Sequence, residues 1–496
     1  MSADYLALLK LAAPETLVVL AALAVLAIDL TVMRGEPVRN RMLVAGLFAF
    51  LGFFAAGFFM AESGAHGRVA EGMLVVEPLG RVTKFVLLAL AAFTLLLAVD
   101  ADFTDHAGEF VALVLLATVG MMFMVSTENL LMIFVSLELA SLSLYTLAAF
   151  NKRNPRSAEA ALKYFLFGGM AAAFMLFGLS LLYGLTGSID LVQIARAMHA
   201  RAFDPMLAVA LVLTLMGFGF KIAAVPFHLW APDAYQGAPT PAAALIAGGS
   251  KVASFLLLAK VLTAGFAGAE GSGAWRNAAA GWTPLLCTVA LLSMILGNLA
   301  AIAQTSVKRL LAWSAVAHAG YALLGILGDG DRGVSALLYY VATYGLTVVG
   351  ALGVVGVMER GGDATLADFA GLRRRSPMLA VCMMIFLLSL AGIPPLAGFF
   401  GKFYVFVAAA GAAKNLGLLW LVIAAIAMSA VSLYYYLLVL KQAFVEEAPE
   451  DAPPIAVPPA STIALGLIAA GVVLLGCAPD LLLDPIAAAL AGATHH

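Results

Sequence analysis

Long apolar runs recur along this chain and constrain its fold more than any other feature. Many of them approach the roughly 20 residues that cross the hydrocarbon core of a bilayer as a helix. The first lies near Leu17 and the last ends near Leu475. A cleaved signal peptide would explain one such run but not a whole series. The sequence therefore predicts an all-α polytopic membrane protein.

The composition agrees with this prediction and excludes several function classes. Charged residues make up 11% of the 496 residues, whereas a soluble domain carries about 25%. The formal net charge of -2 argues against a nucleic-acid partner, which would need a basic face. Cys287, Cys382 and Cys477 lie far apart in apolar stretches, a spacing that fits no zinc, haem or iron–sulfur site. We therefore expect three buried thiols, and no metal or cofactor in this chain.

Hydropathy predicts about fourteen transmembrane helices, with boundaries uncertain by several residues. The expected stretches are 12–32, 42–60, 80–99, 109–125, 129–149, 160–183, 206–228, 240–264, 283–303, 307–327, 334–357, 378–408, 416–441 and 461–478. The acidic, proline-rich segment from Glu446 to Pro459 is expected to be a loop before the last helix.

The loops between these helices carry an asymmetric charge that predicts orientation. Basic clusters follow odd-numbered helices: Arg34, Arg39 and Arg41; Lys152, Arg153 and Arg156; Lys308 and Arg309; and Arg360 with Arg373, Arg374 and Arg375. Loops rich in Lys and Arg stay in the cytoplasm. We therefore expect both termini on the periplasmic side of a bacterial inner (plasma) membrane.

Two of the expected helices contain prolines that a continuous helix would not tolerate. Pro226 lies in the seventh helix, and Pro394 with Pro395 lies in the twelfth. Proline removes a backbone donor, so such a break survives in lipid only inside protein or beside a watery cavity. Paired breaks of this kind are typical of inverted-repeat transporters. We predict two inverted five-helix repeats, helices 4–8 and 9–13, with helices 7 and 12 discontinuous.

This repeat divides the chain into four expected parts. They are a three-helix segment (1–105), a first antiporter-like repeat (106–265), a second inverted repeat (266–445), and a loop with the last helix (446–496).

Charged side chains inside apolar helices are the candidate functional residues. Six lysines fall there: Lys84, Lys163, Lys221, Lys251, Lys260 and Lys402. A charge at the bilayer centre costs about 2.5–3.5 kcal/mol on insertion scales, so such residues are usually functional. Lys84 and Lys260 lie near helix ends and are expected to snorkel to the interface. The other four are the candidates for proton transfer.

Glu138 is the one acid deep in the fifth helix. It could form a static ion pair that locks two helices, or a switchable pair with Lys221 or Lys163 that shifts the affinity of the lysine for its proton. His228 and His318 also have two interpretations, as proton relays or as hydrogen-bonded core histidines.

Two segments carry a family resemblance. Residues 219–254 read GFKIAAVPFHLWAPDAYQGAPTPAAALIAGGSKVAS, and residues 390–403 read LAGIPPLAGFFGKF. Both resemble the antiporter-like membrane subunits of respiratory complex I, the energy-converting NADH:quinone oxidoreductase. The resemblance runs from about the fourth expected helix to the thirteenth.

The resemblance implies roles for individual residues. Glu138 matches the fifth-helix glutamate of the family and Lys221 the seventh-helix lysine that pairs with it. Lys251 matches the central lysine of the eighth helix, and Lys402 the twelfth-helix lysine that faces the exit. Lys163 resembles an additional lysine of the subunit called N. Since subunit M carries glutamate at the position of Lys402, and subunit L continues into a long lateral helix, the chain resembles the subunit N branch.

The implied function is a proton-translocating part of an enzyme complex, a translocase without a redox centre of its own. FMN and iron–sulfur clusters are expected in partner subunits, which pass electrons from NADH to (ubi)quinone. The expected partners are neighbours of the M, K, J and A types, through them the redox arm, and the lipid bilayer. The alternative within the superfamily is a subunit of a multi-protein Na+/H+ antiporter or of a membrane-bound hydrogenase. An independent solute transporter and a structural scaffold are more distant alternatives.

Overall fold

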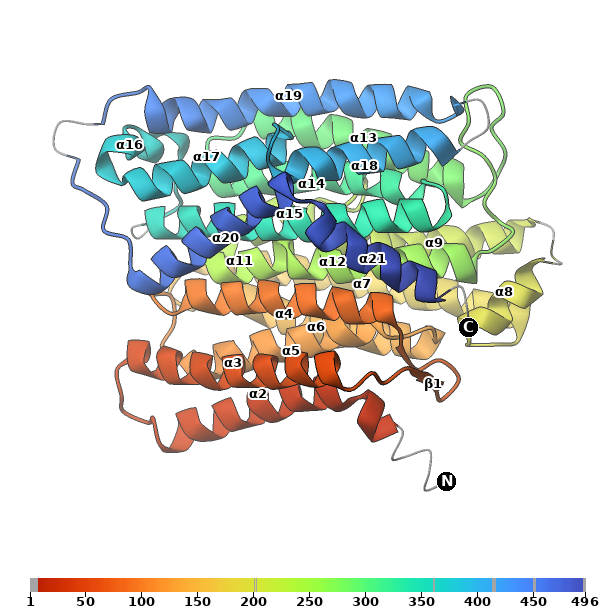
Figure 1. The fold of residues 1–496 in the computed structure, drawn as a ribbon, viewed down its shortest axis with the longest axis horizontal. Coiled ribbons are helices and arrows are strands. Elements are labelled where there is room, and N and C mark those ends of the chain that lie inside the picture. Colours follow the sequence, from red (N-terminus) through yellow and green to blue (C-terminus); the bar gives the residue numbers. More distant parts are fainter. Residues whose placement is uncertain are drawn as a thin grey trace.

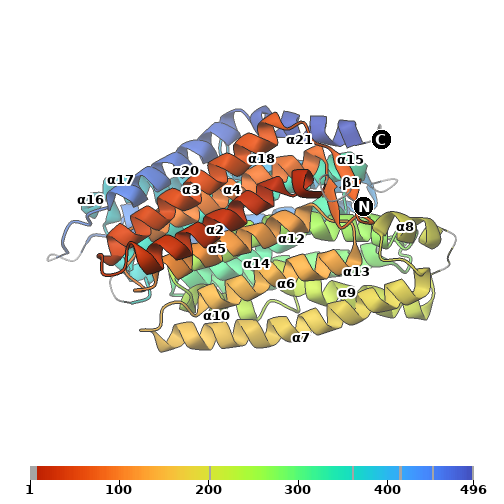
Figure 2. The ribbon, with the colours of Figure 1, turned by 90° about the horizontal axis from the view of Figure 1, so that it is seen from below.

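The computed structural model describes residues 8–199, 201, 203–359, 362–412, 416–448 and 452–493. Over these residues the chain is a bundle of helices that run roughly along one direction (Figures 1 and 2). The expected all-α architecture holds except for a small antiparallel hairpin of β1 (Gly67–Val69) and β2 (Leu74–Val76). Two three-residue strands leave no periodic pattern in the sequence, so hydropathy could not predict them.

The N-terminal segment contains three long helices. They are α2 (Ala13–Thr31), α3 (Val38–Glu62) and α4 (Pro78–Ala98). They pack side by side on the rest of the bundle (Figure 1). The Asp29 carboxylate fastens α2 to its neighbours, because it accepts hydrogen bonds from Arg41 Nε of α3 (2.8 Å) and from the backbone of Gly108 (3.1 Å).

The next part of the chain runs from α5 to a short π-helix. Its elements are α5 (Ala107–Val125), α6 (Leu130–Ala148), α7 (Pro155–Thr186), α8 (Leu191–His199), α9 (Pro205–Ile222), α10 (Trp230–Gly237), α11 (Thr240–Ala247), α12 (Gly249–Lys260) and η1 (Val261–Gly265). Polar side chains start three of these helices: Asn129, Asn154 and Asp204 accept hydrogen bonds from backbone N–H groups of the first turns of α6, α7 and α9. These caps satisfy donors that have no partner within the helix.

The remaining elements complete the bundle. They are α13 (Trp282–Ile302), α14 (Val307–Ile326), α15 (Gly330–Met358), the 3-10 helix η2 (Leu366–Phe369), α16 (Leu372–Arg375), α17 (Pro377–Ala391), α18 (Ala397–Ala412), α19 (Leu419–Phe444), α20 (Pro459–Cys477) and α21 (Asp480–Ala493). Sequence analysis did not predict α21, which packs on α4 and α15. Its 14 residues are too few to cross a bilayer, so a search for spans passes over it.

The expected membrane helices are confirmed. Among the described residues, twelve helices are long and apolar enough to cross a membrane. Two further expected spans are α14, which begins with the charged pair Lys308 and Arg309, and the broken helix made of α17 and α18. Each expected stretch therefore coincides with helical structure.

Both predicted discontinuities are present. The α9 helix ends at Ile222, Ala223 adopts a left-handed φ of 57°, and α10 starts only at Trp230. The α17 helix ends at Ala391, Gly392 has a φ of +89°, and α18 starts at Ala397. The bonds Val225–Pro226 and Pro394–Pro395 are cis.

Hydroxyl side chains satisfy the backbone at these breaks. Val225 N donates to Ser293 Oγ (2.9 Å), and Gly398 N donates to Ser389 Oγ (3.1 Å). The interior of the protein thus supplies the partners that lipid cannot supply.

The two ends of the bundle differ. The described parts of the N- and C-terminal regions lie at one end, here called the terminal end (Figure 1). The α2–α3 loop and α16, which carry basic clusters, lie at the other, here called the basic end. Arg153 of the α6–α7 loop also lies there, since it pairs with Asp102 (3.2 Å) and Asp105 (2.7 Å) of the α4–α5 loop. Arg360, which was assigned to one of these clusters, lies outside the described residues.

Candidate functional site

Lys221 is buried at the C-terminal end of α9, directly before the first break. Its Nζ atom donates hydrogen bonds to Ser141 Oγ and to Tyr145 Oη (3.4 Å), both from α6. It also lies 5.1 Å from the centre of the Tyr145 ring. The ammonium group is therefore held by hydroxyls and an aromatic face.

Glu138 lies one helical turn before Ser141 on α6, so the two side chains share a face. Its Oε1 atom is buried without a hydrogen-bond partner. The ion pairs of the described residues do not join Glu138 to Lys221, whose ammonium group donates to Ser141 and Tyr145 instead. The expected direct pair is thus absent here, and Ser141 holds the lysine in its place.

Lys163 lies in a different environment from the one expected. It is 40% exposed on α7 and forms ion pairs with Glu159 (2.7 Å) and Asp233 (2.8 Å). Asp233, on α10, also accepts a hydrogen bond from Arg309 of α14 (2.7 Å). The prediction that Lys163 is a buried lysine is wrong, because this side of α7 is on the outside of the bundle. Sequence analysis missed Asp233, although it lies inside the motif of residues 219–254.

Lys251 is completely enclosed on α12. Its Nζ atom donates to the backbone oxygen of Ala315 on α14 (2.5 Å) and lies 5.4 Å from the centre of the Tyr344 ring.

Lys402 is buried on α18, just after the second break. Its Nζ atom donates to the backbone oxygen of Ala391 (3.0 Å) and to Ser429 Oγ of α19 (2.8 Å). Ala391 is the last residue of α17, so its carbonyl has no partner within the helix and is free to accept. The break therefore supplies the acceptor for the lysine.

His318 lies between tyrosines that contact these two lysines. It is buried on α14, and its ring packs against Tyr344, which lies beside Lys251, and against Tyr321, which lies beside Lys402. Its Nδ1 atom lies 2.7 Å from Tyr340 Oη, and its Nε2 atom lies 3.2 Å from Tyr436 Oη. A neutral imidazole can donate through one nitrogen and accept through the other. Lys251, His318 and Lys402 thus form one buried polar region.

Sequence analysis missed the tyrosines of this region. Tyr340 and Tyr436 contact His318, and the centre of the Tyr321 ring lies 4.9 Å from Lys402 Nζ. The signal was present, since tyrosines cluster in residues 339–344 and 434–436 of otherwise apolar helices. A buried tyrosine hydroxyl usually has a hydrogen-bond partner, so these clusters indicate polar contacts.

His228 lies at the first break but outside this buried region. It is 7% exposed, its ring contacts Trp313 edge to face with centroids 5.3 Å apart, and its Nδ1 atom has no hydrogen-bond partner. Pro226 marks the same break, as Pro394 and Pro395 mark the second.

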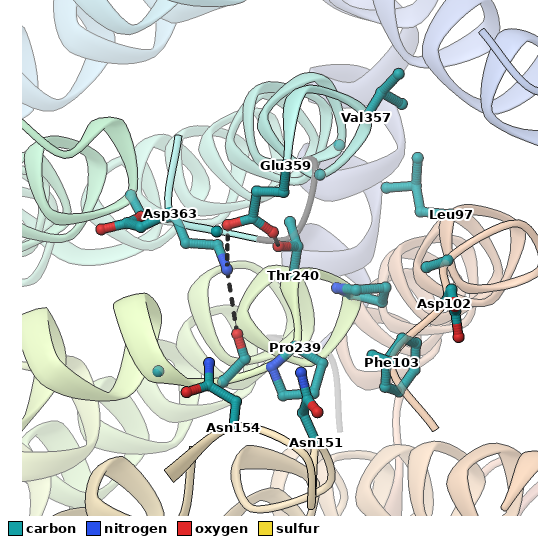
Figure 3. A pocket seen from close by; sticks show the side chains of 18 of the residues that line it. Leu97, Asp102, Phe103, Asn151, Asn154, Pro239, Thr240, Val357, Glu359 and Asp363 are labelled. Carbon is teal, nitrogen blue, oxygen red and sulfur yellow. Dashed lines mark hydrogen bonds and ion pairs between the residues drawn. The ribbon is translucent and has the colours of Figure 1, made fainter. Parts of the chain in front are cut away.

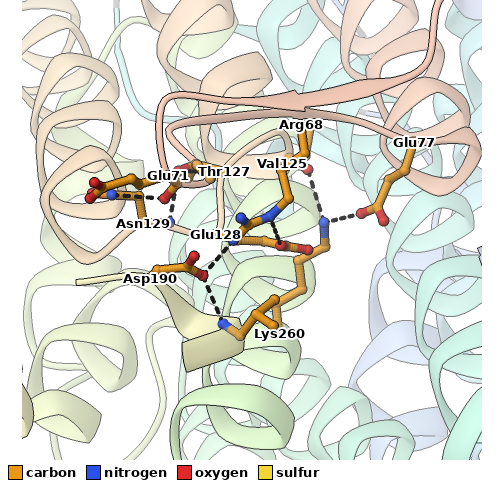
Figure 4. Close-up of polar contacts among 11 residues, drawn as sticks. Arg68, Glu71, Glu77, Val125, Thr127, Glu128, Asn129, Asp190 and Lys260 are labelled. Carbon is orange, nitrogen blue, oxygen red and sulfur yellow. Dashed lines mark hydrogen bonds and ion pairs between the residues drawn. The ribbon is translucent and has the colours of Figure 1, made fainter. Parts of the chain in front are cut away.

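Lys84 and Lys260 both form ion pairs with acidic residues. Lys84 is buried and forms an ion pair with Glu15 of α2 (2.6 Å), which is also buried. Lys260 pairs with Glu77, directly before α4 (Figure 4). Nearby, Arg68 of the hairpin pairs with Glu128 and Asp190. Acidic partners that are distant in sequence hold these cations inside the protein.

A cavity of about 780 Å³ opens at the basic end (Figure 3). Residues of the α4–α5, α6–α7 and α10–α11 connections line it, together with Lys308, Glu359 and Asp363. Lys308 is buried, pairs with Glu359 (2.8 Å) and donates to the backbone oxygen of Ala238 (3.2 Å). Thr240, the first residue of α11, donates to the same glutamate (2.5 Å).

Lys251 lies beyond this basic-end cavity along α11 and α12. Thr240 and Lys251 lie on the consecutive helices α11 and α12. Eleven residues of helix extend about 16 Å, so the cavity ends about three turns from the lysine.

The described residues contain no group of three His, Cys, Asp or Glu side chains that could hold a metal ion. Cys287 and Cys382 are buried as expected, but Cys477 at the end of α20 is exposed.

Comparison with known proteins gives consistent results. Residues 127–429 match the family model for the transmembrane region of NADH:quinone oxidoreductase and Mrp antiporters. The chain is 52% identical to NADH-quinone oxidoreductase subunit N 2 of Acidobacterium capsulatum, over 97% of this chain and 98% of that protein.

Solved structures show the same fold. A chain of respiratory complex I from Thermus thermophilus with bound aureothin is 34% identical, with a TM-score of 0.77, covering 95% of this chain and 98% of that one. A chain of the Mrp complex from a Dietzia species has a TM-score of 0.81 over 98% of this chain and 97% of that one. At 22% identity this second likeness concerns the fold alone.

Proposed function

Because the chain belongs to the family of NADH-quinone oxidoreductase subunit N, we propose that it carries protons across the membrane as part of the membrane arm of respiratory complex I. Electron transfer from NADH to quinone in partner subunits, which hold the FMN and iron–sulfur clusters, drives this movement. The observation that carries the proposal is the buried region in which the Tyr344 ring lies beside both Lys251 and His318, and the Tyr321 ring lies beside both His318 and Lys402.

The partners of these lysines favour proton transfer over a static role. Lys221, Lys251 and Lys402 donate hydrogen bonds to hydroxyl and carbonyl oxygens. Among the described residues, none of the three lysines forms an ion pair. A buried ammonium without an anion is costly, so its neutral form is comparatively favoured. Hydroxyls can donate or accept, and they can therefore serve a lysine in either protonation state.

The proposed route starts at the basic end, which we assign to the cytoplasm, so that both termini lie outside. Protons enter the basic-end cavity and reach Lys251. They pass through His318 to Lys402 and leave at the terminal end along α18.

Glu138 and Lys221 form the proposed control element. In the structure Ser141 holds the lysine one turn from the carboxylate. Rotation of the lysine between Ser141 and Glu138 would change its affinity for a proton, because a close anion favours the charged form. The conformational signal from the quinone-reducing subunits would act on this choice.

Neighbours of the M, K, J and A types are the proposed partners. The four-part division at residues 105, 265 and 445 is proposed to separate the N-terminal segment, the two repeats and the last helix.

The rival function, a subunit of a Na+/H+ antiporter or a hydrogenase, differs in its partners. Co-purification of flavin and iron–sulfur subunits with this chain supports the proposal, and a purely membrane-embedded assembly contradicts it.

The test uses the assembled complex in membrane vesicles. Lys221→Ala and Lys251→Ala should lose NADH oxidation and proton pumping together, while native gels show intact assembly. Lys441→Ala is the matched control, since this lysine is 57% exposed on α19 and pairs with Glu446. Normal pumping by an assembled Lys251→Ala complex would overturn the proposed route.

A further inference from the structure

Four carboxylates line the basic-end cavity, and one of them differs from the others. Asp100 pairs with Arg39 (3.5 Å), Asp102 with Arg153 (3.2 Å) and Glu359 with Lys308 (2.8 Å). The fourth, Asp363, forms none of the ion pairs of the described residues. Its hydrogen-bond partners are neutral: the Gln236 side-chain amide donates to Oδ2, and Ser306 Oγ donates to Oδ1 (3.0 Å).

We propose that Asp363 is the proton-collecting residue of this cavity, the first group to take a proton from the cytoplasmic water. The proposal rests on the proposed function and deepens it. A carboxylate paired with a cation must give up that pair when it is protonated, which costs free energy. Asp363 can accept a proton without losing an ion pair, so it is the lining carboxylate best suited to this step.

The position of Asp363 suits transfer further inward. It lies between α15 and η2, four residues after Glu359, and both side chains border the same cavity (Figure 3). In each step a hydronium ion gives its proton to the carboxylate and becomes water. The new O–H bond then breaks, and the proton passes to a cavity water, which becomes hydronium and carries it inward past the Glu359–Lys308 pair toward Lys251. One positive charge moves inward, and Asp363 returns to its anionic form.

The neighbours of Asp363 hold the site open. Gln236 Oε1 accepts a hydrogen bond from Arg309 Nη1 (2.9 Å), so its amide group stays oriented toward Asp363. Ser306 caps α14 by accepting from Arg309 N (3.3 Å). The charged groups of the elements packed around the site are Asp233 on α10, Lys308 and Arg309 on α14, Glu359 at the end of α15 and Asp368 on η2.

The test is Asp363→Asn in the complete complex, with assembly checked on native gels. Asparagine has nearly the same shape but cannot take up the proton. We expect NADH oxidation and pumping to fall at least fivefold at alkaline pH, where proton collection is limiting. The loss should shrink as the pH is lowered, since more hydronium then reaches the inner groups directly. Asp363→Glu should restore most of the activity.

Asp102→Asn is the matched control, because Asp102 lines the same cavity but pairs with Arg153. It should leave activity unchanged at every pH. Wild-type activity of assembled Asp363→Asn across the pH range, or equal losses in the Asn and Glu variants, would overturn the proposal. If Asp363→Asn does not assemble, Asp363→Ser is judged by the same criteria.

Lys251→Ala, measured in parallel, separates this inference from the proposed function. If Lys251→Ala is inactive while Asp363→Asn is normal, the collecting role alone fails. If both are fully active, the proposed function fails with it.

Discussion

Replacement of His318 by glutamine separates a relay from a structural histidine. Glutamine carries one donor and one acceptor group at the end of its side chain, as neutral imidazole does. It can therefore keep hydrogen bonds to Tyr340 and Tyr436, whose hydroxyls lie 2.7 and 3.2 Å from the histidine nitrogens. Glutamine cannot be protonated at physiological pH, so it keeps the packing and removes the proton carrier.

The structure sets the expected size of the effect. Lys251 and Lys402 contact separate sets of oxygens, from α14 and from α17 and α19. Without His318 a proton must cross between them over hydroxyls and water alone. We expect turnover of His318→Gln to fall at least tenfold, which corresponds to about 1.4 kcal/mol of added barrier.

His318→Leu adds a stability effect that glutamine avoids. It leaves Tyr340 Oη without its described partner, whereas Tyr436 Oη keeps Ser314 at 2.5 Å. One unsatisfied buried hydroxyl costs about 1–3 kcal/mol, so this variant should also lower the thermal stability of the complex.

The assay measures NADH oxidation and the NADH-driven pH gradient in inverted membrane vesicles, normalised to assembled complex. A relay predicts that both the Gln and the Leu variants lose the two activities. Full pumping by His318→Gln would refute the reasoning and identify His318 as a structural residue.

Three further predictions concern stability. Lys84→Ala should destabilise the complex by about 3–5 kcal/mol, because it leaves buried Glu15 without its cation. The double change Glu15→Gln with Lys84→Met removes both charges and should restore most of the thermal midpoint. Equal midpoints for the two variants would contradict this. Gly398→Ala should impair assembly on native gels, because its Cβ would lie 1.9 Å from the Ser389 carbonyl oxygen, while Gly411→Ala on the same helix meets nothing within 4 Å and should assemble normally. Hydrogen bonding and charge from Arg153 lower the pKa of Asp105, so this pair stabilises the protein above about pH 4 and loses its effect as the pH falls below that. Because the pair is exposed, Asp105→Asn should leave the melting temperature unchanged at pH 7, and a large shift there would show that the pair matters more than its exposure implies.

The fold could be predicted where the physics is local. Length and hydropathy predict the membrane-spanning helices, and Pro226, Pro394 and Pro395 mark the breaks, because each signal lies within one helix. Elements outside the spans, such as α21 and the β1–β2 hairpin, carry no comparable signal.

The site could be predicted less well, because it depends on contacts between distant segments. Hydropathy identified Lys84 and Lys163 as charges in apolar helices. It did not show that Lys84 would be buried in an ion pair with Glu15, or that Lys163 would lie on the outside of the bundle. Nor could the sequence single out Asp363, because its proposed role depends on which carboxylates of the basic-end cavity form ion pairs with Lys or Arg. Partners this far apart in the sequence are set by packing, and sequence patterns do not reveal them.

The breaks and the lysines depend on each other. Carbonyls inside a helix already accept a hydrogen bond within it, whereas the last carbonyls of a helix are free to accept one from an ammonium group. The end of α17 exposes the Ala391 carbonyl to Lys402, and the C-terminal end of α9 places Lys221 beside the hydroxyls of α6. A carboxylate at either place would stabilise the charged lysine and hold its proton. A neutral oxygen keeps the lysine hydrogen-bonded but holds the proton less strongly. The breaks therefore help Lys221 and Lys402 to stay buried without a close counter-ion, which is the condition for a lysine to pass a proton on.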